Sequence, residues 1–163
     1  SLSMAKETNL REELGLVRPL RLFRDRQFVL ALVAGCGVSV LVAGMSSVAD
    51  SSGVSLTLLQ AFSLVLWYPV LEELLFRGAL QGLFSTTAFG QRVLMGLSLA
   101  NVLTAVLFTL LHLVYRADPL AWLVFFPGLV FGYFRDRHGS ILGPVILHSA
   151  YNACLIPGWY LFS

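Results

Sequence analysis

The sequence predicts an all-α, polytopic membrane protein: a transmembrane bundle of about five apolar helical segments, preceded by an N-terminal interfacial helix. Composition is the first observation behind this prediction. Of 163 residues, 57% are hydrophobic and 12% are charged, and the mean hydropathy is +0.79, values typical of integral membrane proteins. Long apolar runs separated by short polar stretches are the second observation. The lipid bilayer is therefore the expected surrounding, and no nucleic-acid partner is expected.

The N-terminal part differs from the rest of the chain. Residues 1–27 are polar and mixed in charge, so we separate them from a transmembrane helical domain, residues 28–163. Apolar positions between residues 7 and 22 recur on roughly one helical face. Two interpretations stay open, a helix lying in the membrane interface and a solvated helix leading into the first span. The apolar positions are Leu10, Leu14, Val17 and Leu20.

Five apolar runs follow in the second part. The first is rich in small residues that let helices approach closely, and the fourth, about 15 residues against the usual ~20, is short for a crossing. Within the second run, Pro69 removes a backbone hydrogen bond. We expect a kink there and a freed carbonyl that faces a cavity. The runs cover residues 28–48, 56–80, 93–115, 120–134 and 141–162, and a charged loop is expected at 135–138.

Charged and aromatic residues predict the orientation in the membrane. Basic residues favour the cytoplasmic side, and they crowd before the first run and between alternate runs. Aromatic residues gather where the other surface is expected. Arg116 is the exception. The sequence therefore predicts a cytoplasmic N-terminus and an outer C-terminus. The basic residues are Arg18, Arg21, Arg24, Arg26, Arg92, Arg135 and Arg137; the aromatic ones are Tyr115, Trp122, Trp159 and Tyr160.

The stretch from Pro69 to Gln81 carries charges inside an apolar run. Glu72 and Glu73 are adjacent, and Arg77 follows Glu73 at i+4, so these two share a helix face and are expected to pair. Ionisable residues at membrane depth usually face a bundle interior or a water-filled cavity and are functional. A purely structural salt bridge explains Glu73 with Arg77. It leaves Glu72 without a partner in sequence.

Two further apolar runs carry histidines. His112 ends the third run, and a lone histidine of this kind is more often a packing residue. His148 and Asn152 lie at i, i+4 in the fifth run and project together, either as interhelical hydrogen-bonding residues or as part of a site. With straight helices, His112 lies far from Glu72. A common site therefore requires tilt, a kink or a shifted third span.

Together these side chains suit the hydrolysis of an amide bond. A carboxylate in a low-dielectric setting is a good general base for water, which Glu72 supplies while Arg77 holds Glu73 ionised. A histidine helps to orient the water. An amide or imidazole donates to the developing oxyanion. Cys36 and Cys154 indicate neither a disulfide framework nor a metal site.

Three motifs in this order, EELLFR, FTLLH and HSAYN, resemble the EExxxR, FxxxH and HxxxN/D motifs of the CPBP family, the CAAX-type intramembrane proteases. The resemblance implies a glutamate-type intramembrane endopeptidase of a prokaryotic inner membrane, without a metal. Its expected substrate is a membrane-anchored peptide or protein. By the same resemblance, Glu72 is the base, His112 assists, His148 and Asn152 stabilise the oxyanion, and Glu73 and Arg77 are supporting residues. The matched positions are Glu72, Glu73, Arg77, Phe108, His112, His148 and Asn152.

Two other functions stay open. A zinc peptidase would use Glu72, His112 and His148 as ligands, although the sequence lacks HExxH. A non-catalytic membrane adaptor or proton-linked carrier would also keep intramembrane carboxylates and histidines. Replacing Asn152 by alanine separates these possibilities, because an adaptor or carrier tolerates it and a protease does not.

Overall fold

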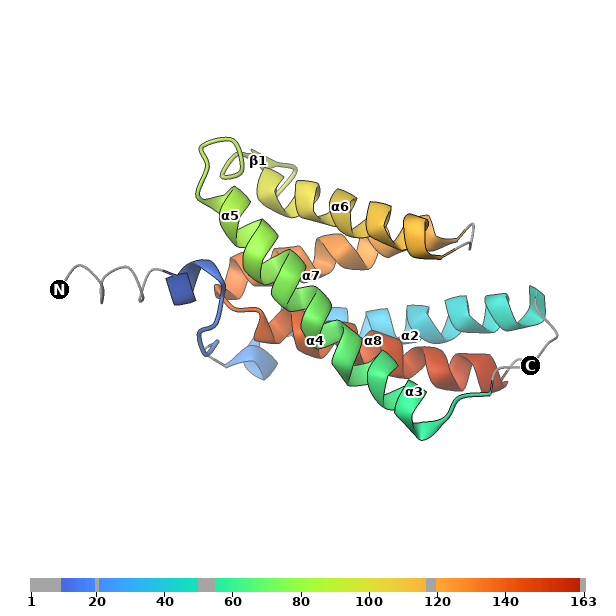
Figure 1. Ribbon diagram of the computed structural model, residues 1–163. Coiled ribbons are helices and arrows are strands. Elements are labelled where there is room, and N and C mark those ends of the chain that lie inside the picture. The colour runs from blue at the N-terminus through green and yellow to red at the C-terminus, as the bar shows by residue number, and fades with distance from the viewer. Residues whose placement is uncertain (1–9, 20, 50–54, 117–119, 162–163) are drawn as a thin grey trace. The chain divides into compact units, whose positions relative to one another are not determined.

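The computed structural model describes residues 10–19, 21–49, 55–116 and 120–161, and the regular elements in this part of the chain are helices apart from one short hairpin (Figure 1). The predicted all-α class is therefore confirmed. Contacts divide the chain into two units. The first unit combines Ser1–Leu22 with Glu72–Pro144, and the second combines Phe23–Leu71 with Val145–Ser163.

Helix α2 (Arg26–Ala49) and helix α8 (Leu142–Leu161) dominate the second unit. They pack closely because small residues of one helix lie against the other. A Cβ atom at Gly35 would overlap the Tyr151 ring, and one at Gly158 would lie 2.5 Å from the Val40 carbonyl oxygen. The Tyr151 hydroxyl also donates to the Ala31 carbonyl at 2.7 Å. Gly35 of the first apolar run therefore allows close helix packing, as predicted.

One long apolar stretch begins in the second unit and ends in the first. It consists of α3 (Leu58–Phe62), the π-helical η2 (Ser63–Trp67), α4 (Tyr68–Glu73), the π-helical η3 (Leu74–Leu80) and α5 (Gln81–Ser85). Short π-helical turns inside α-helices are frequent at functional sites. The two glutamates lie in α4, between the two π-helical turns.

The third predicted span begins later than expected. Residues 93–98 form a hairpin of β1 (Val93–Leu94) and β2 (Leu97–Ser98), antiparallel with Val93 opposite Ser98. Met95 (φ 54°) and Gly96 (φ 84°) form its turn, and left-handed conformation at both turn residues suits a two-residue hairpin. Helix α6 (Leu99–Tyr115) starts only after Ser98, whose hydroxyl accepts from the Asn101 N–H at 3.0 Å.

The expected charged loop at 135–138 is wrong, because these residues form the last turn of α7 (Phe125–His138), which follows the 3-10 turn η4 (Ala121–Val124). Gly139 ends the helix in the left-handed conformation. Arg135 is buried, and its guanidinium donates to the Glu13 carbonyl at 2.5 Å and to the Arg77 carbonyl at 3.1 Å. Basic side chains favour a helix C-terminus, which explains why this polar run remains helical.

The N-terminal segment is not one continuous helix over residues 7–22. Within the described residues, helix covers 10–13, and Gly15 then takes the left-handed conformation (φ 68°). The Gly15 carbonyl accepts from the Ile141 N–H at 3.0 Å, and the Val17 carbonyl accepts from the Ser140 hydroxyl at 2.6 Å. The segment thus docks onto the first unit. Residues 7–9 and 20 of the predicted helix lie outside the described residues, and the predicted boundary at residue 27 stays a prediction.

Two helical stretches of the described chain are long and apolar enough to cross a membrane, Arg26–Ser46 and Leu58–Ser85. The helix Leu99–Tyr115 is apolar but shorter. Length and composition therefore identify two candidate membrane spans in the described residues, and the predicted total of about five stays a prediction.

Candidate functional site

A buried ion pair lies at the centre of the first unit. The Arg77 guanidinium is 3.1 Å from a Glu73 carboxylate oxygen, and both side chains are fully buried, as the i, i+4 spacing predicted. Arg77 also donates to the Gly128 carbonyl at 2.9 Å. A Cβ atom at position 128 would lie 3.3 Å from the donating nitrogen. Glycine on α7 thus gives the guanidinium space to reach the backbone.

Aromatic rings enclose the remaining surface of the guanidinium. Its central carbon lies 4.5 Å from the centroid of the Phe108 ring and 5.2 Å from that of Phe131. Phe76 packs edge-on against Phe108 with centroids 5.1 Å apart. A cation over aromatic faces away from water is stabilised by about 2 kcal/mol. The phenylalanine of the FTLLH motif therefore acts as a wall of the Arg77 site.

The same phenylalanine contacts the histidine of its motif. The rings of Phe108 and His112 have centroids 4.3 Å apart, and His112 Nδ1 lies 2.9 Å from the Phe108 carbonyl oxygen. A carbonyl only accepts, so Nδ1 carries a proton. In the neutral ring the lone pair then belongs to Nε2. Nε2 is 4.0 Å from a carboxylate oxygen of Glu72.

Glu72 and His112, far apart in the sequence, thus meet in the first unit. Their side chains are 27% and 12% exposed, whereas those of Glu73 and Arg77 are not exposed at all. The neighbouring glutamates therefore differ in environment. Glu73 neutralises a buried cation, whereas Glu72 faces a histidine and remains partly exposed at the surface of the first unit. Straight helices would have kept Glu72 and His112 far apart, but in the structure the two side chains are 4.0 Å apart.

Several polar residues that sequence reasoning did not assign support this arrangement. Gln81 is fully buried, and its amide donates to the Gly132 carbonyl at 2.9 Å and to Asp136 at 2.8 Å. The other Asp136 oxygen accepts from the Ser98 hydroxyl at 2.6 Å. Asp136 therefore ties α5, α7 and the start of α6 together. In the sequence, the signal for this network was a glutamine, Gln81, that follows Arg77 by one helical turn at the end of an apolar run.

A π-helical turn frees the Arg77 carbonyl for its contact with Arg135. In an α-helix that carbonyl would accept from the Gln81 N–H, but in η3 the Gln81 N–H bonds to the Phe76 carbonyl. Arg135 Nε donates to the Arg77 carbonyl instead, at 3.1 Å. The backbone that carries the Arg77 side chain is thereby held from α7.

His148 and Asn152 belong to the second unit, on the same side of α8. His148 is 6% exposed, and the Asn152 amide donates to the Leu64 carbonyl at 2.9 Å. This carbonyl lacks both usual backbone donors. In η2 the Tyr68 N–H bonds to the Ser63 carbonyl, and Pro69 has no N–H.

The carbonyl that Pro69 was predicted to free is therefore that of Leu64. The Asn152 amide donates to it, and the cavity expected beside it stays a prediction. Asparagine has two amide hydrogens, so one remains for another acceptor. Asn152 consequently has a structural task as well as its predicted role in the oxyanion site.

No group of three or more His, Cys, Asp or Glu side chains in the described chain is positioned to hold a metal ion. Zinc in a catalytic site usually takes three protein ligands and water. Metal independence stays a prediction.

One comparison with known proteins gives a match. The family model described as "Type II CAAX prenyl endopeptidase Rce1-like" matches residues 54–154, which include all three motifs. No curated protein and no solved structure matches the chain significantly.

Proposed function

The chain belongs to the Rce1-like family of type II CAAX prenyl endopeptidases, and from this membership we propose that it is an intramembrane endopeptidase of the glutamate type. The family consists of membrane proteases that act on membrane-associated proteins. For this chain, the proposal is cleavage of a peptide bond in a membrane-anchored peptide or protein during its maturation or C-terminal processing.

The observation that carries the proposal is the geometry of Glu72 and His112. A separation of 4.0 Å between carboxylate oxygen and Nε2 is too long for a direct hydrogen bond and suits one water molecule in contact with both. Because the Phe108 carbonyl holds Nδ1–H, Nε2 is set to accept from that water. The carboxylate of Glu72 accepts a hydrogen bond from the other hydrogen of the water, and as general base it takes that proton.

The reaction follows general acid–base chemistry. Water loses a proton to Glu72 as its oxygen attacks the scissile carbonyl, which gives a tetrahedral intermediate with a negative oxygen. The protonated Glu72 then donates to the leaving amine as the C–N bond breaks. His148 and Asn152 are proposed as donors to the negative oxygen, a role that rests on the HSAYN motif.

Glu73 and Arg77 have a supporting role in this proposal. The pair is fully buried at 3.1 Å and follows Glu72 directly on the same helix. Arg77 also contacts Phe108, whose carbonyl fixes the tautomer of His112. The ion pair therefore holds the helix of the base against the helix of the histidine.

We further propose the membrane arrangement that the sequence predicts. It comprises about five membrane segments with a cytoplasmic N-terminus, in a prokaryotic inner membrane. Two apolar helices of spanning length support a membrane location. The grouping of basic residues supports the orientation.

A fluorogenic peptide with a membrane-anchored C-terminal tail tests the function. Glu72→Gln keeps the shape of the side chain but removes the base, so kcat should fall by roughly 10²–10⁴ with little change in KM. Glu12→Gln, at an exposed glutamate, is the matched control and should retain parental activity. Turnover by Glu72→Gln within tenfold of the parent would remove Glu72 from the role of base.

A further inference from the structure

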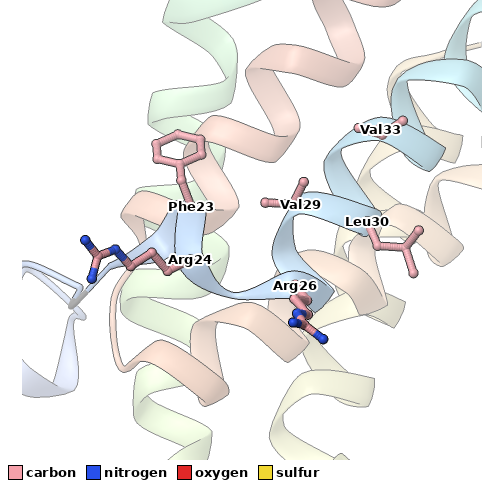
Figure 2. Close-up of a pocket in the computed structure, with 6 residues that line it drawn as sticks. All are labelled: Phe23, Arg24, Arg26, Val29, Leu30 and Val33. Carbon is pink, nitrogen blue, oxygen red and sulfur yellow. The ribbon is translucent and has the colours of Figure 1, made fainter.

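A shallow groove lies at the start of α2, and none of its lining residues belongs to the site described above. It has a volume of about 380 Å³ and is lined by six residues of η1 (Leu22–Arg24) and the first turns of α2. In Figure 2 both arginine side chains extend outward from the chain at the beginning of the helix, in different directions, Arg24 to the left and Arg26 downward. The lining residues are Phe23, Arg24, Arg26, Val29, Leu30 and Val33.

The groove changes from cationic to apolar along the helix. Arg26, Val29 and Leu30 are spaced i, i+3, i+4, and Val33 adds i+7, so one helix face carries a charge followed by aliphatic side chains. At 1.5 Å per residue this stripe is roughly 10 Å long. Leu30 is 69% and Val33 67% exposed. An amphipathic ligand with one anionic end matches this gradient.

The cationic end is not neutralised from within the groove. No acidic residue lines it, and among the described residues neither Arg24 nor Arg26 takes part in an ion pair. Asp25 lies between them in sequence, and its carboxylate accepts from the Gln27 N–H at 3.0 Å. Three charged groups thus leave a net positive charge at the mouth of the groove.

Phe23 gives the groove a fixed aromatic wall. It is 63% exposed, yet its ring packs edge-on against the fully buried Phe28, with centroids 5.8 Å apart. Exposed aromatic rings at the end of a spanning helix lie at the level of lipid headgroups. Since α2 is 24 residues long and contains the apolar stretch Arg26–Ser46, which is long enough to cross a membrane, we expect the groove to lie where headgroups meet acyl chains.

We propose that this groove binds an anionic phospholipid. The phosphate is held by Arg24 and Arg26, and an acyl chain lies along Val29, Leu30 and Val33. Guanidinium groups suit phosphate because they donate two parallel hydrogen bonds. A zwitterionic lipid would bring its own cation towards the same arginines, so the groove favours lipids with a net negative headgroup.

Lipid binding to the purified full chain tests this proposal. The probes are dioleoyl phosphatidylglycerol and dioleoyl phosphatidylcholine, counted by native mass spectrometry after titration in detergent. Each arginine near a lipid surface contributes enough to change binding about fivefold, so the parent should prefer phosphatidylglycerol by roughly 10- to 30-fold. Arg24→Gln combined with Arg26→Gln should reduce the preference to under threefold.

Arg92→Gln is the matched control, because Arg92 is also an exposed arginine beside an aromatic ring, that of Phe89, at 6.0 Å. It should keep the parental preference; an equal loss in this variant would mean general charge attraction and overturn the site. If the double glutamine variant does not fold, Arg24→Lys with Arg26→Lys keeps the charge but loses the paired donors, and an intermediate preference is expected.

Two further arms identify the ligand. Glycerol 1-phosphate carries the headgroup phosphate without acyl chains and should not displace bound phosphatidylglycerol at tenfold excess; displacement would assign the groove to a soluble phosphate. A neutral prenylated peptide should also leave the lipid bound. Its displacement of the lipid, together with an unchanged preference in the arginine variants, would assign the groove to substrate and refute the lipid site.

Discussion

Replacing Glu73 by glutamine removes the carboxylate that pairs with Arg77 inside the first unit. Both side chains are fully buried and 3.1 Å apart, so the guanidinium would keep its charge in a low-dielectric setting without the carboxylate that contacts it. Breaking such a pair by removing one partner costs about 3–5 kcal/mol. The neighbouring Glu72 is 27% exposed, and its replacement by glutamine should cost under about 1 kcal/mol because this side chain is only partly buried.

The structure places the expected loss at the lower end, about 3 kcal/mol. Arg77 keeps its hydrogen bond to the Gly128 carbonyl and its contacts with Phe108 and Phe131. The new amide oxygen can also still accept from the guanidinium. For a chain of this length, 1 kcal/mol shifts Tm by roughly 2–4 °C. Glu73→Gln should therefore lower Tm by about 6–12 °C, and Glu72→Gln by less than about 4 °C.

Thermal unfolding in one detergent, followed by circular dichroism, measures both variants against the parent. A second comparison separates charge from shape: Glu73→Gln with Arg77→Met removes both charges and should recover most of the lost stability. Equal Tm values for the two glutamine variants would refute the buried-pair argument. So would a double variant whose loss is the sum of the two single losses.

The remaining predictions concern metal dependence, Asn152 and Gly82. Peptidase activity should survive prolonged chelation in detergent, and loss of activity with rescue by zinc would favour the metallopeptidase alternative. Asn152→Ala should cost on the order of 10²–10³ in turnover and also about 1–3 kcal/mol of stability, because the Leu64 carbonyl loses its donor; an unchanged Tm would contradict that hydrogen bond. Gly82→Ala should lower Tm, because the added Cβ would overlap the Glu13 carbonyl. The same change should make the N-terminal segment more sensitive to protease. Ala79→Gly, at an exposed position of the same stretch, is the control.

Features that depend on neighbours along one helix could be predicted from the sequence. The Glu73–Arg77 pair is an example, since residues four apart on a helix face one another wherever the helix lies. The same applies to His148 and Asn152 on α8, and to the freed carbonyl near Pro69, which follows from the missing N–H of proline. The three motifs likewise identified the family, because their order along the chain can be read without knowing how the helices pack.

Residues 93–98 show where hydropathy misleads. They are apolar enough to be taken as the beginning of a span, yet they form a hairpin whose turn needs left-handed residues at Met95 and Gly96. Residues 135–138 show the opposite error. Their polarity predicted a loop, but they continue α7 because Arg135 is buried against carbonyls of the N-terminal segment and of Arg77. Hydropathy measures transfer from water and does not include such hydrogen bonds.

The sequence by itself determined the helical class, the family and the local pairs along each helix. Only the tertiary structure decided that the two neighbouring glutamates differ. Glu73 faces Arg77 inside the first unit, while Glu72 meets His112 from α6 at 4.0 Å. Likewise, the acceptor for Arg77 on α7 is a glycine carbonyl 51 residues away. Contacts of this kind depend on how helices cross, and crossing is set by packing at glycines and aromatic rings rather than by any pattern along one segment.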